Sequence, residues 1–287
     1  MKAELLVSTE TLEAHLHDPD WIVFDTRHDL ADTEKGRRAW TAAHIPGAYF
    51  LHMDEDLSGA KTGTNGRHPL PPIEEFALRM NRCGVAPGRQ VVVYDDGSSS
   101  FAVRLWWLLR WLGHDRVAVL DGGFAAWQRE KRPLDAAVPA PRAGSFLPAP
   151  MPGAAVDKDY VATFRETPEV RIIDARAPAR FAGEQETIDP VAGHIPGAVN
   201  RFWQMNLGTD GRFLAPQQLR AQFLELLDGA TPALAVHNCG SGVTACHNLF
   251  AMELAGLAGS RLYPGSWSEW CADSSKPVAT GPSVIAR

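Results

Sequence analysis

A glycine-containing loop around one cysteine is the part of the sequence best suited to covalent chemistry. Cys239 is followed by Gly240, Ser241 and Gly242, and apolar residues with helical spacing begin at Ala245. Glycines let such a loop turn several backbone N–H groups inward, and this nest, with the dipole of the following helix, stabilises an anion at its centre. We therefore expect Cys239 to be a thiolate nucleophile, reactive at neutral pH, that forms a covalent intermediate.

Other interpretations of this loop fit the residues less well. A lone cysteine is more often a buried apolar side chain, but a glycine-rich turn between a strand and a helix favours a nucleophile. Together with His237, Cys246 and His247, Cys239 matches no common zinc spacing, and a nest of N–H groups favours anions, so no metal is expected. A phosphate-binding Cys-x5-Arg loop needs an arginine where this chain has Ala245, which argues against phosphoryl chemistry.

The elements that position this loop follow an α/β pattern. Apolar, β-branched runs predict strands at 21–24, 90–94, 117–120, 170–173 and 234–237. Helical spacing of apolar residues is found at 73–83, 217–227 and 245–254. Alternation of this kind predicts parallel sheets with helices on both faces, and such sheets bind ligands at the carboxyl ends of their strands. Cys239 follows the strand predicted at 234–237 and so lies at such an end.

The chain also contains a two-fold internal repeat. Segments of the first half resemble segments of the second in the same order: 24–27 and 173–176, 43–48 and 193–198, 120–127 and 263–270. A repeat kept in register indicates two similar structural units. In this alignment Cys239 corresponds to Asp96, so the first half keeps a similar loop without the thiol. We expect one catalytic half and one structural half.

The length of 287 residues also favours two domains. A stretch rich in proline and alanine begins at Pro133 and continues to Pro152 and Gly153, and it suits an extended linker because proline interrupts helices. We predict a non-catalytic domain at 1–140, a linker at 141–155 and a catalytic domain at 156–287.

Composition excludes several classes of function. The formal net charge is -6 and no block of lysine and arginine is present, so nucleic acid is not an expected partner. No apolar run approaches the length of a membrane span, and residues 1–7 lack the features of a signal peptide. No membrane partner is therefore expected. Four cysteines in a chain of this length do not form a disulfide scaffold, and reduced thiols favour a cytoplasmic protein.

The motifs together resemble the tandem-domain rhodanese family over almost the whole chain. The matching segments are the loop 239–246, which looks like the active loop of 3-mercaptopyruvate sulfurtransferases, the His-Ile-Pro-Gly-Ala pair at 44–48 and 194–198, the segment 265–270 and the opening 6–10. The resemblance implies two tandem rhodanese-like domains, each a parallel sheet flanked by helices. It also implies a catalytic C-terminal domain and an inactive N-terminal domain.

The resemblance assigns roles to further residues. Ser241 matches a serine that pairs with a histidine and an aspartate, here His68 and Asp54, and an oriented pair of this kind suits protonation of departing pyruvate. Arg180 matches an arginine that binds the substrate carboxylate, for which its planar fork is suited. Substrate-binding backbone groups are expected from the rest of the loop: Gly240, Gly242, Val243 and Thr244.

The expected reaction is the transfer of sulfane sulfur from 3-mercaptopyruvate, through a persulfide on Cys239, to cyanide or a thiol, either thioredoxin-like or of low molecular weight. No cofactor is required. The chain departs from the family pattern because residues 184–192 contain no second substrate arginine; Arg104 is a weak substitute. The loop also lacks cationic side chains, which favours a monocarboxylate over the thiosulfate dianion. A thiosulfate sulfurtransferase and a non-catalytic module for sulfur relay or binding remain alternatives.

Overall fold

The computed structural model describes residues 4–282, so the predicted domain ends at 1–3 and 283–287 lie outside the described residues. The described chain forms two compact units. The first consists of residues up to 59, 70–151 and 209–213, and the second of 60–69, 152–208 and residues from 214 onwards. Each unit therefore includes a short segment from the other half of the sequence, which the sequence pattern did not indicate.

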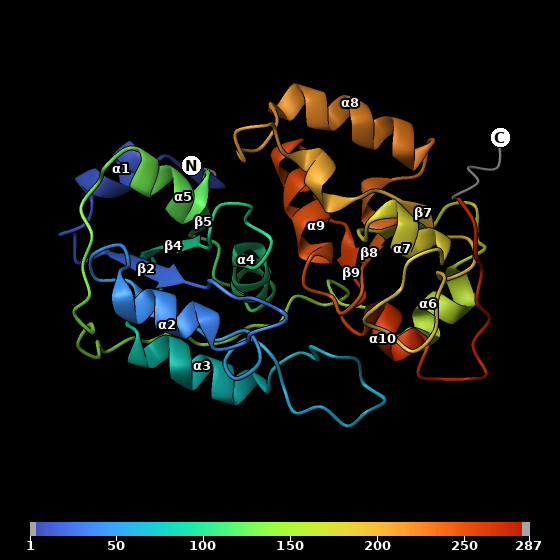
Figure 1. Cartoon of the computed structure of the whole chain (residues 1–287), viewed down its shortest axis with the longest axis horizontal. Helices are drawn as coiled ribbons and strands as arrows, with labels where there is room; N and C mark the ends of the chain where they lie inside the picture. Colours follow the sequence, from blue (N-terminus) through green and yellow to red (C-terminus); the bar gives the residue numbers. More distant parts are fainter. Residues whose placement is uncertain (1–3, 283–287) are drawn as a thin grey trace. The chain divides into compact units, whose positions relative to one another are not determined.

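The first unit is built on a parallel sheet with strand order β1-β5-β4-β2-β3. Its strands are β1 (Leu6–Val7), β2 (Trp21–Asp25), β3 (Tyr49–Phe50), β4 (Gln90–Tyr94) and β5 (Val117–Leu120). Its helices are α1 (Thr9–Ala14), α2 (Lys35–Ala42), α3 (Ile73–Arg82), α4 (Ala102–Trp111) and α5 (Gly123–Arg129). Figure 1 shows α1 and α5 along one side of this sheet and α2 and α3 along the other.

Alternating strand residues explain this layering, because successive side chains of a strand point to opposite faces. Val23 of β2 and Val92 of β4 belong to a buried cluster that also contains Leu12 of α1 and Trp127 of α5. Strand β4 is buried along its whole length, as expected for a central parallel strand covered on both faces.

The second unit repeats this arrangement, with strand order β7-β6-β8-β9. Its strands are β6 (Arg171–Asp174), β7 (Val199–Asn200), β8 (Ala235–Asn238) and β9 (Arg261–Leu262). Its helices are α6 (Lys158–Phe164), α7 (Pro178–Ala182), α8 (Pro216–Leu227), α9 (Ala245–Leu254) and α10 (Ser266–Trp270), with 3₁₀ turns η1 (Trp203–Asn206) and η2 (Pro232–Leu234). A parallel bridge from Ala155 to Leu262 lies where β1 pairs with β5 in the first unit.

The prediction of an α/β fold with parallel sheets flanked by helices is confirmed. The strands predicted at 90–94 and 117–120 have the predicted bounds. The strand predicted at 21–24 extends one residue further, to Asp25, and those predicted at 170–173 and 234–237 begin and end one residue later than predicted. The strand predicted to begin at Leu234 begins at Ala235, because Pro232–Leu234 forms the turn η2. None of the helices in residues 4–282 is long and apolar enough to cross a membrane.

Candidate functional site

Cys239 lies where β8 ends, in the loop that leads to α9. Its side chain is buried, at 2% exposure. The backbone N–H groups of Ser241 and Gly242 donate to its Sγ, at 3.4 and 3.1 Å. The sulfur therefore lies against inward-turned main-chain donors rather than in an apolar pocket, which is the arrangement expected for a stabilised thiolate.

Two features hold this loop in its conformation. Gly242 has φ +79°, and a Cβ at this position would lie 2.3 Å from the carbonyl oxygen of Pro264, so only glycine fits there. The carbonyl oxygens of Cys239 and Gly240 accept hydrogen bonds from the N–H groups of Trp267 and Ser268, at 3.0 and 2.9 Å. The loop is thus fixed by the turn that begins α10.

Ser266 completes this support. Its hydroxyl oxygen accepts from the backbone N–H of Cys239 at 3.1 Å and donates to the carbonyl of Tyr263 at 2.9 Å. Ser266 has φ +53°, and Gly123 has φ +54° at the matching position of the first unit. A side chain in this left-handed region is unusual, and here it satisfies the N–H group of the nucleophile.

The matching loop of the first unit contains a buried aspartate in place of the cysteine. Asp95 follows β4 as Cys239 follows β8, and its carbonyl accepts from Phe124 N–H at 2.8 Å, as that of Cys239 does from Trp267. The sequence alignment of Cys239 with Asp96 is therefore wrong by one residue. The cause is one extra residue in the first loop.

The side chain of Asp95 shows what this type of loop binds. Its Oδ1 accepts from the N–H groups of Gly97 and Ser99, at 3.0 and 2.9 Å, and its Oδ2 from those of Phe101 and Ala102, at 2.8 and 3.2 Å. Burial raises the pKa of Asp95, and these four donors oppose that shift. Because both oxygens only accept, the carboxylate form fits the loop, which is therefore a receptor for an anion.

The structure brings together two of the predicted catalytic residues. Nδ1 of His68 lies 2.7 Å from the hydroxyl oxygen of Ser241, and both side chains are buried. His68 belongs to the segment 60–69 of the second unit, and Ser241 also donates its N–H to Cys239 Sγ. Ser241 thus links the hydroxyl–imidazole pair to the nucleophile, because it contacts both His68 and Cys239.

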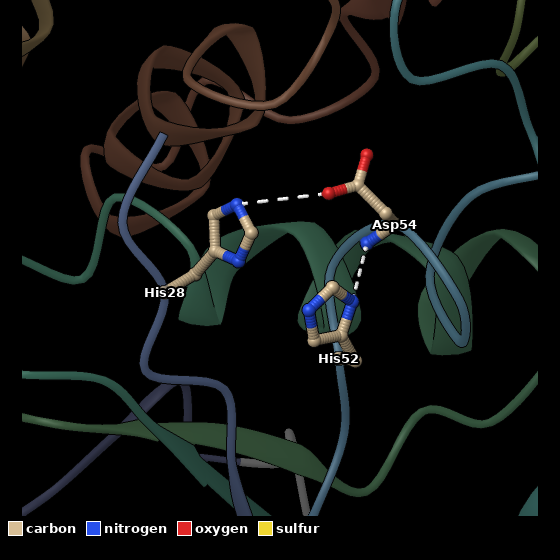
Figure 2. A group of neighbouring side chains, drawn as sticks. All are labelled: His28, His52 and Asp54. Carbon is tan, nitrogen blue, oxygen red and sulfur yellow. Dashed lines mark hydrogen bonds and ion pairs between the residues drawn. The ribbon is translucent and has the colours of Figure 1, made fainter. Parts of the chain in front are cut away.

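Asp54, the third predicted member, belongs to the first unit. Its Oδ2 lies 3.9 Å from His28 Nε2, and its backbone N–H donates to His52 Nδ1 at 3.2 Å, as Figure 2 shows. Its assignment to the pair of Ser241 and His68 stays a prediction.

Possible metal ligands occur in this part of the first unit. Ligand atoms of His28, His52 and Asp54 lie within 4.8 Å of one another. However, Nδ1 of His52 accepts from the Asp54 backbone, and its Nε2 lies 3.0 Å from the carbonyl oxygen of Thr33. Both ring nitrogens of His52 are therefore engaged with the main chain, and the cluster does not fit a metal centre.

Arg180, the predicted substrate-binding arginine, lies beside the nucleophile loop. A Cβ on Gly240 would be 3.6 Å from its Nη2. Its fork is already paired, because Nε and Nη2 donate to Glu186 at 3.2 and 2.8 Å, and Nη2 also donates to Asp189 at 3.2 Å. Arg180 thus lies near Gly240, where internal carboxylates bind it, and its role in substrate binding stays a prediction.

A second guanidinium at the loop comes from Arg67, which the sequence analysis missed. Its Nη2 is 2.7 Å from where a Gly240 Cβ would lie, and its Nη1 pairs with Asp189. Its backbone N–H donates to the hydroxyl of Ser268 at 3.0 Å. Burial lowers the pKa of Arg67, and negative charge on Cys239 opposes this shift.

The remaining predicted residues complete the loop. Val243 is buried, and Thr244 is the residue before the first turn of α9. The thiol of Cys246 donates to the carbonyl of Gly242 at 3.3 Å, and its side chain is buried inside the helix.

Arg104, the weak candidate for a second substrate arginine, is buried in α4 of the first unit.

Residues missed by the sequence analysis had only weak signals. Arg67 directly precedes His68, a predicted site residue, but nothing in its spacing indicates that it points to the loop. Glu186 and Asp189 lie in the segment 184–192, and their spacing has no periodicity that points to Arg180. Ser266 lies in a repeated segment, but its supporting role depends on a left-handed backbone conformation.

Known proteins resemble this chain over most of its length. The model of the rhodanese-like domain matches twice, at residues 8–130 and 157–273. A Pseudomonas aeruginosa protein named "Probable 3-mercaptopyruvate sulfurtransferase" is 47% identical over 283 residues, which cover 98% of this chain and 100% of that protein. The thiosulfate sulfurtransferase of Bos taurus is 33% identical over 281 residues, covering 92% of this chain and 91% of that protein.

Solved structures show the same relationship. The structure of 3-mercaptopyruvate sulfurtransferase from Leishmania major matches with a TM-score of 0.83 and 29% identity. The match covers 96% of this chain and 76% of that chain.

Proposed function

Because this chain belongs to the rhodanese family, we propose that it is a sulfurtransferase in which Cys239 accepts a sulfur atom from 3-mercaptopyruvate. The family match confirms the predicted tandem rhodanese-like organisation. The sulfurtransferase names of its relatives bear out the predicted type of enzyme. The observation that carries the proposal is the Sγ of Cys239, which accepts two backbone N–H groups at the carboxyl end of β8.

In the first half-reaction the Cys239 thiolate attacks the sulfur of 3-mercaptopyruvate. The new Sγ–S bond forms as the S–C3 bond of the donor breaks, and the electron pair leaves on carbon as the enolate of pyruvate. The enolate takes up a proton to give pyruvate, and Cys239 holds a persulfide.

The side chain of Asp95 indicates where the outer sulfur of the persulfide would be bound. Its carboxylate oxygens lie two bonds beyond Cβ, as the outer sulfur of a cysteine persulfide does. In the first unit four loop N–H groups bind those oxygens. We assign the loop amides from Gly240 to Thr244 to the stabilisation of the terminal sulfur anion.

The pair of Ser241 and His68 is proposed to protonate the enolate. The Ser241 hydroxyl lies 2.7 Å from an imidazole nitrogen of His68. A proton that the hydroxyl gives to the enolate can therefore be replaced from His68. Asp54 is proposed to orient His68 and to stabilise its protonated form. Arg180 is proposed to bind the donor carboxylate.

In the second half-reaction an acceptor attacks the outer sulfur and releases the Cys239 thiolate. A thiol acceptor becomes a persulfide and cyanide becomes thiocyanate. We propose a thioredoxin-like or low-molecular-weight thiol as acceptor. All four cysteines are free, which supports the proposed cytoplasmic location, where thiols stay reduced.

Intact-mass spectrometry after incubation with 3-mercaptopyruvate tests this function. The wild-type chain should gain one sulfur atom and lose it when thiol is added. Cys239→Ser should gain none, whereas Cys246→Ser, which changes the other thiol of this segment, should gain it as the wild type does. A chain that takes up no sulfur, or that takes it up equally without Cys239, contradicts the proposal.

The same experiment ranks the alternatives. The bovine relative named thiosulfate sulfurtransferase makes thiosulfate the second candidate donor, and faster sulfur uptake from thiosulfate would favour it. A relay module would take up sulfur and release it only to a protein partner. Release to cyanide or a small thiol favours the enzyme.

A further inference from the structure

Four charged side chains form one cluster in the second unit: Arg67, Arg180, Glu186 and Asp189. Asp189 bridges the two arginines, since Oδ1 pairs with Arg67 Nη1 and Oδ2 with Arg180 Nη2 at 3.2 Å. Glu186 holds Arg180 from the other side. The carboxylate side chains are 2% exposed, whereas Arg67 and Arg180 are 29% and 21% exposed.

This charged cluster lies at the nucleophile. Both guanidiniums approach Gly240, the residue directly after Cys239. Burial lowers the pKa of Arg67, and negative charge on Cys239 opposes this shift. An anion that reaches the sulfur therefore meets these two arginines.

The formal charge of the cluster is nevertheless zero, because two carboxylates balance two guanidiniums. A third guanidinium, that of Arg176, pairs with Asp174 at 2.7 Å and with Glu186 at 3.5 Å, so three carboxylates balance three guanidiniums. The loop is thus supplied with bidentate donors for an anion, but with little excess positive charge. An incoming anion has to compete with Asp189 for both arginines.

We propose that Asp189 determines donor specificity, by holding Arg67 and Arg180 in place and competing with the donor anion for them. This inference rests on the proposed function and assigns Arg67 as a second donor-binding arginine. The carboxylate of 3-mercaptopyruvate carries one negative charge and thiosulfate carries two. Repulsion by Asp189 and attraction by the two arginines are both about twice as large for thiosulfate, so the charge of Asp189 removes the advantage that the dianion would otherwise have at these arginines.

Steady-state kinetics with both donors test the proposal in Asp189→Asn, which keeps the shape of the side chain and removes its charge. The ratio of kcat/KM for thiosulfate to that for 3-mercaptopyruvate should rise about tenfold, mainly through a lower KM for thiosulfate. Asp159→Asn is the matched control, because it removes the same charge at a side chain that is 87% exposed. Its donor ratio should equal that of the wild type.

Arg67→Gln is a second test, and its result does not depend on whether Asp189→Asn folds. It should raise KM for thiosulfate more than KM for 3-mercaptopyruvate, with kcat for both donors nearly unchanged, and Arg67→Lys should restore part of the binding. An unchanged donor ratio in either folded variant overturns the inference. If the wild type takes up sulfur from neither donor, the proposed function itself fails. If the wild type takes up sulfur and the folded variants keep the donor ratio of the wild type, only the role of Asp189 fails.

Discussion

Nδ1 of His68 lies 2.7 Å from the hydroxyl oxygen of Ser241, although 173 positions separate the two residues in the chain. Both side chains are buried, so the contact is shielded from bulk water. A buried hydroxyl with one imidazole partner is suited to passing a proton to a neighbouring carbanion. This relationship distinguishes the two candidate donors, because only one of them leaves as a carbanion.

Ser241→Ala should lower kcat with 3-mercaptopyruvate by about 10²-fold or more, in the range of general acid catalysis. Turnover of thiosulfate should fall much less, because sulfite leaves without a proton being added to carbon. Steady-state kinetics with each donor measure the difference. Ser241→Thr keeps the hydroxyl and is the control. Equal losses for both donors in Ser241→Ala would exclude a special role for this hydroxyl.

Gly242→Ala should abolish sulfur uptake by Cys239. The added Cβ would lie 2.3 Å from the carbonyl oxygen of Pro264 at φ +79°, so the loop must move and its N–H groups turn away from the sulfur. Gly229→Ala is the matched control: its φ is +86°, but no atom lies within 4 Å of the added Cβ. That variant should lose only about 1 kcal/mol of stability and keep normal uptake by intact mass. Normal uptake in Gly242→Ala would show that the loop geometry is not required.

Asp95→Asn should destabilise the first unit by about 1–3 kcal/mol, because an amide NH₂ would replace one oxygen that accepts two backbone N–H groups. The neighbouring Asp96→Asn removes the same charge from an exposed side chain and should have little effect. Urea unfolding followed by circular dichroism gives both values. Equal stabilities for the two variants would refute the role of Asp95 as the anion of its loop.

His237 gives the protein a predictable loss of stability in acid. Burial lowers its pKa from the ordinary 6.5 to about 3, so between these values the unfolded chain binds a proton that the folded chain does not. His237 should therefore contribute a decrease of about 1.4 kcal/mol in the free energy of unfolding for each pH unit of acidification within this window. Urea unfolding at pH 7, 6, 5 and 4 measures this slope.

His237→Leu is the comparison, because it keeps an apolar volume on β8 and removes the titrating group. Its slope between pH 6 and 4 should be smaller than that of the wild type by the same amount. Parallel slopes for the two proteins would show that His237 is protonated in the folded state.

The sequence was sufficient for features that depend on local patterns. The strand predicted at 234–237, found as Ala235–Asn238, and the helix from Ala245 follow from apolar periodicity, and the place of Cys239 between them follows from the glycines. The distant pair of His68 and Ser241 was found only through family resemblance, because no local pattern links residues so far apart.

The remaining differences have long-range or single-residue causes. The alignment of Cys239 with Asp96 was one residue off, because one extra loop residue changes the register between β4 and α4. Pairing of Arg180 with Glu186 depends on how the segment 184–192 folds back, and carboxylates at these positions have no periodicity that would reveal it. The position of Arg67 depends on tertiary packing against Ser268.

The membership of residues 60–69 in the second unit has a consequence for dissecting the protein. A polypeptide starting at residue 152 would contain Cys239, Ser241 and Arg180 but would lack His68 and Arg67. Such a fragment would keep a nucleophile while losing its proposed proton relay and half of its anion-binding groups. The two halves of the sequence are thus not interchangeable modules, since each unit includes a segment of chain from the other half.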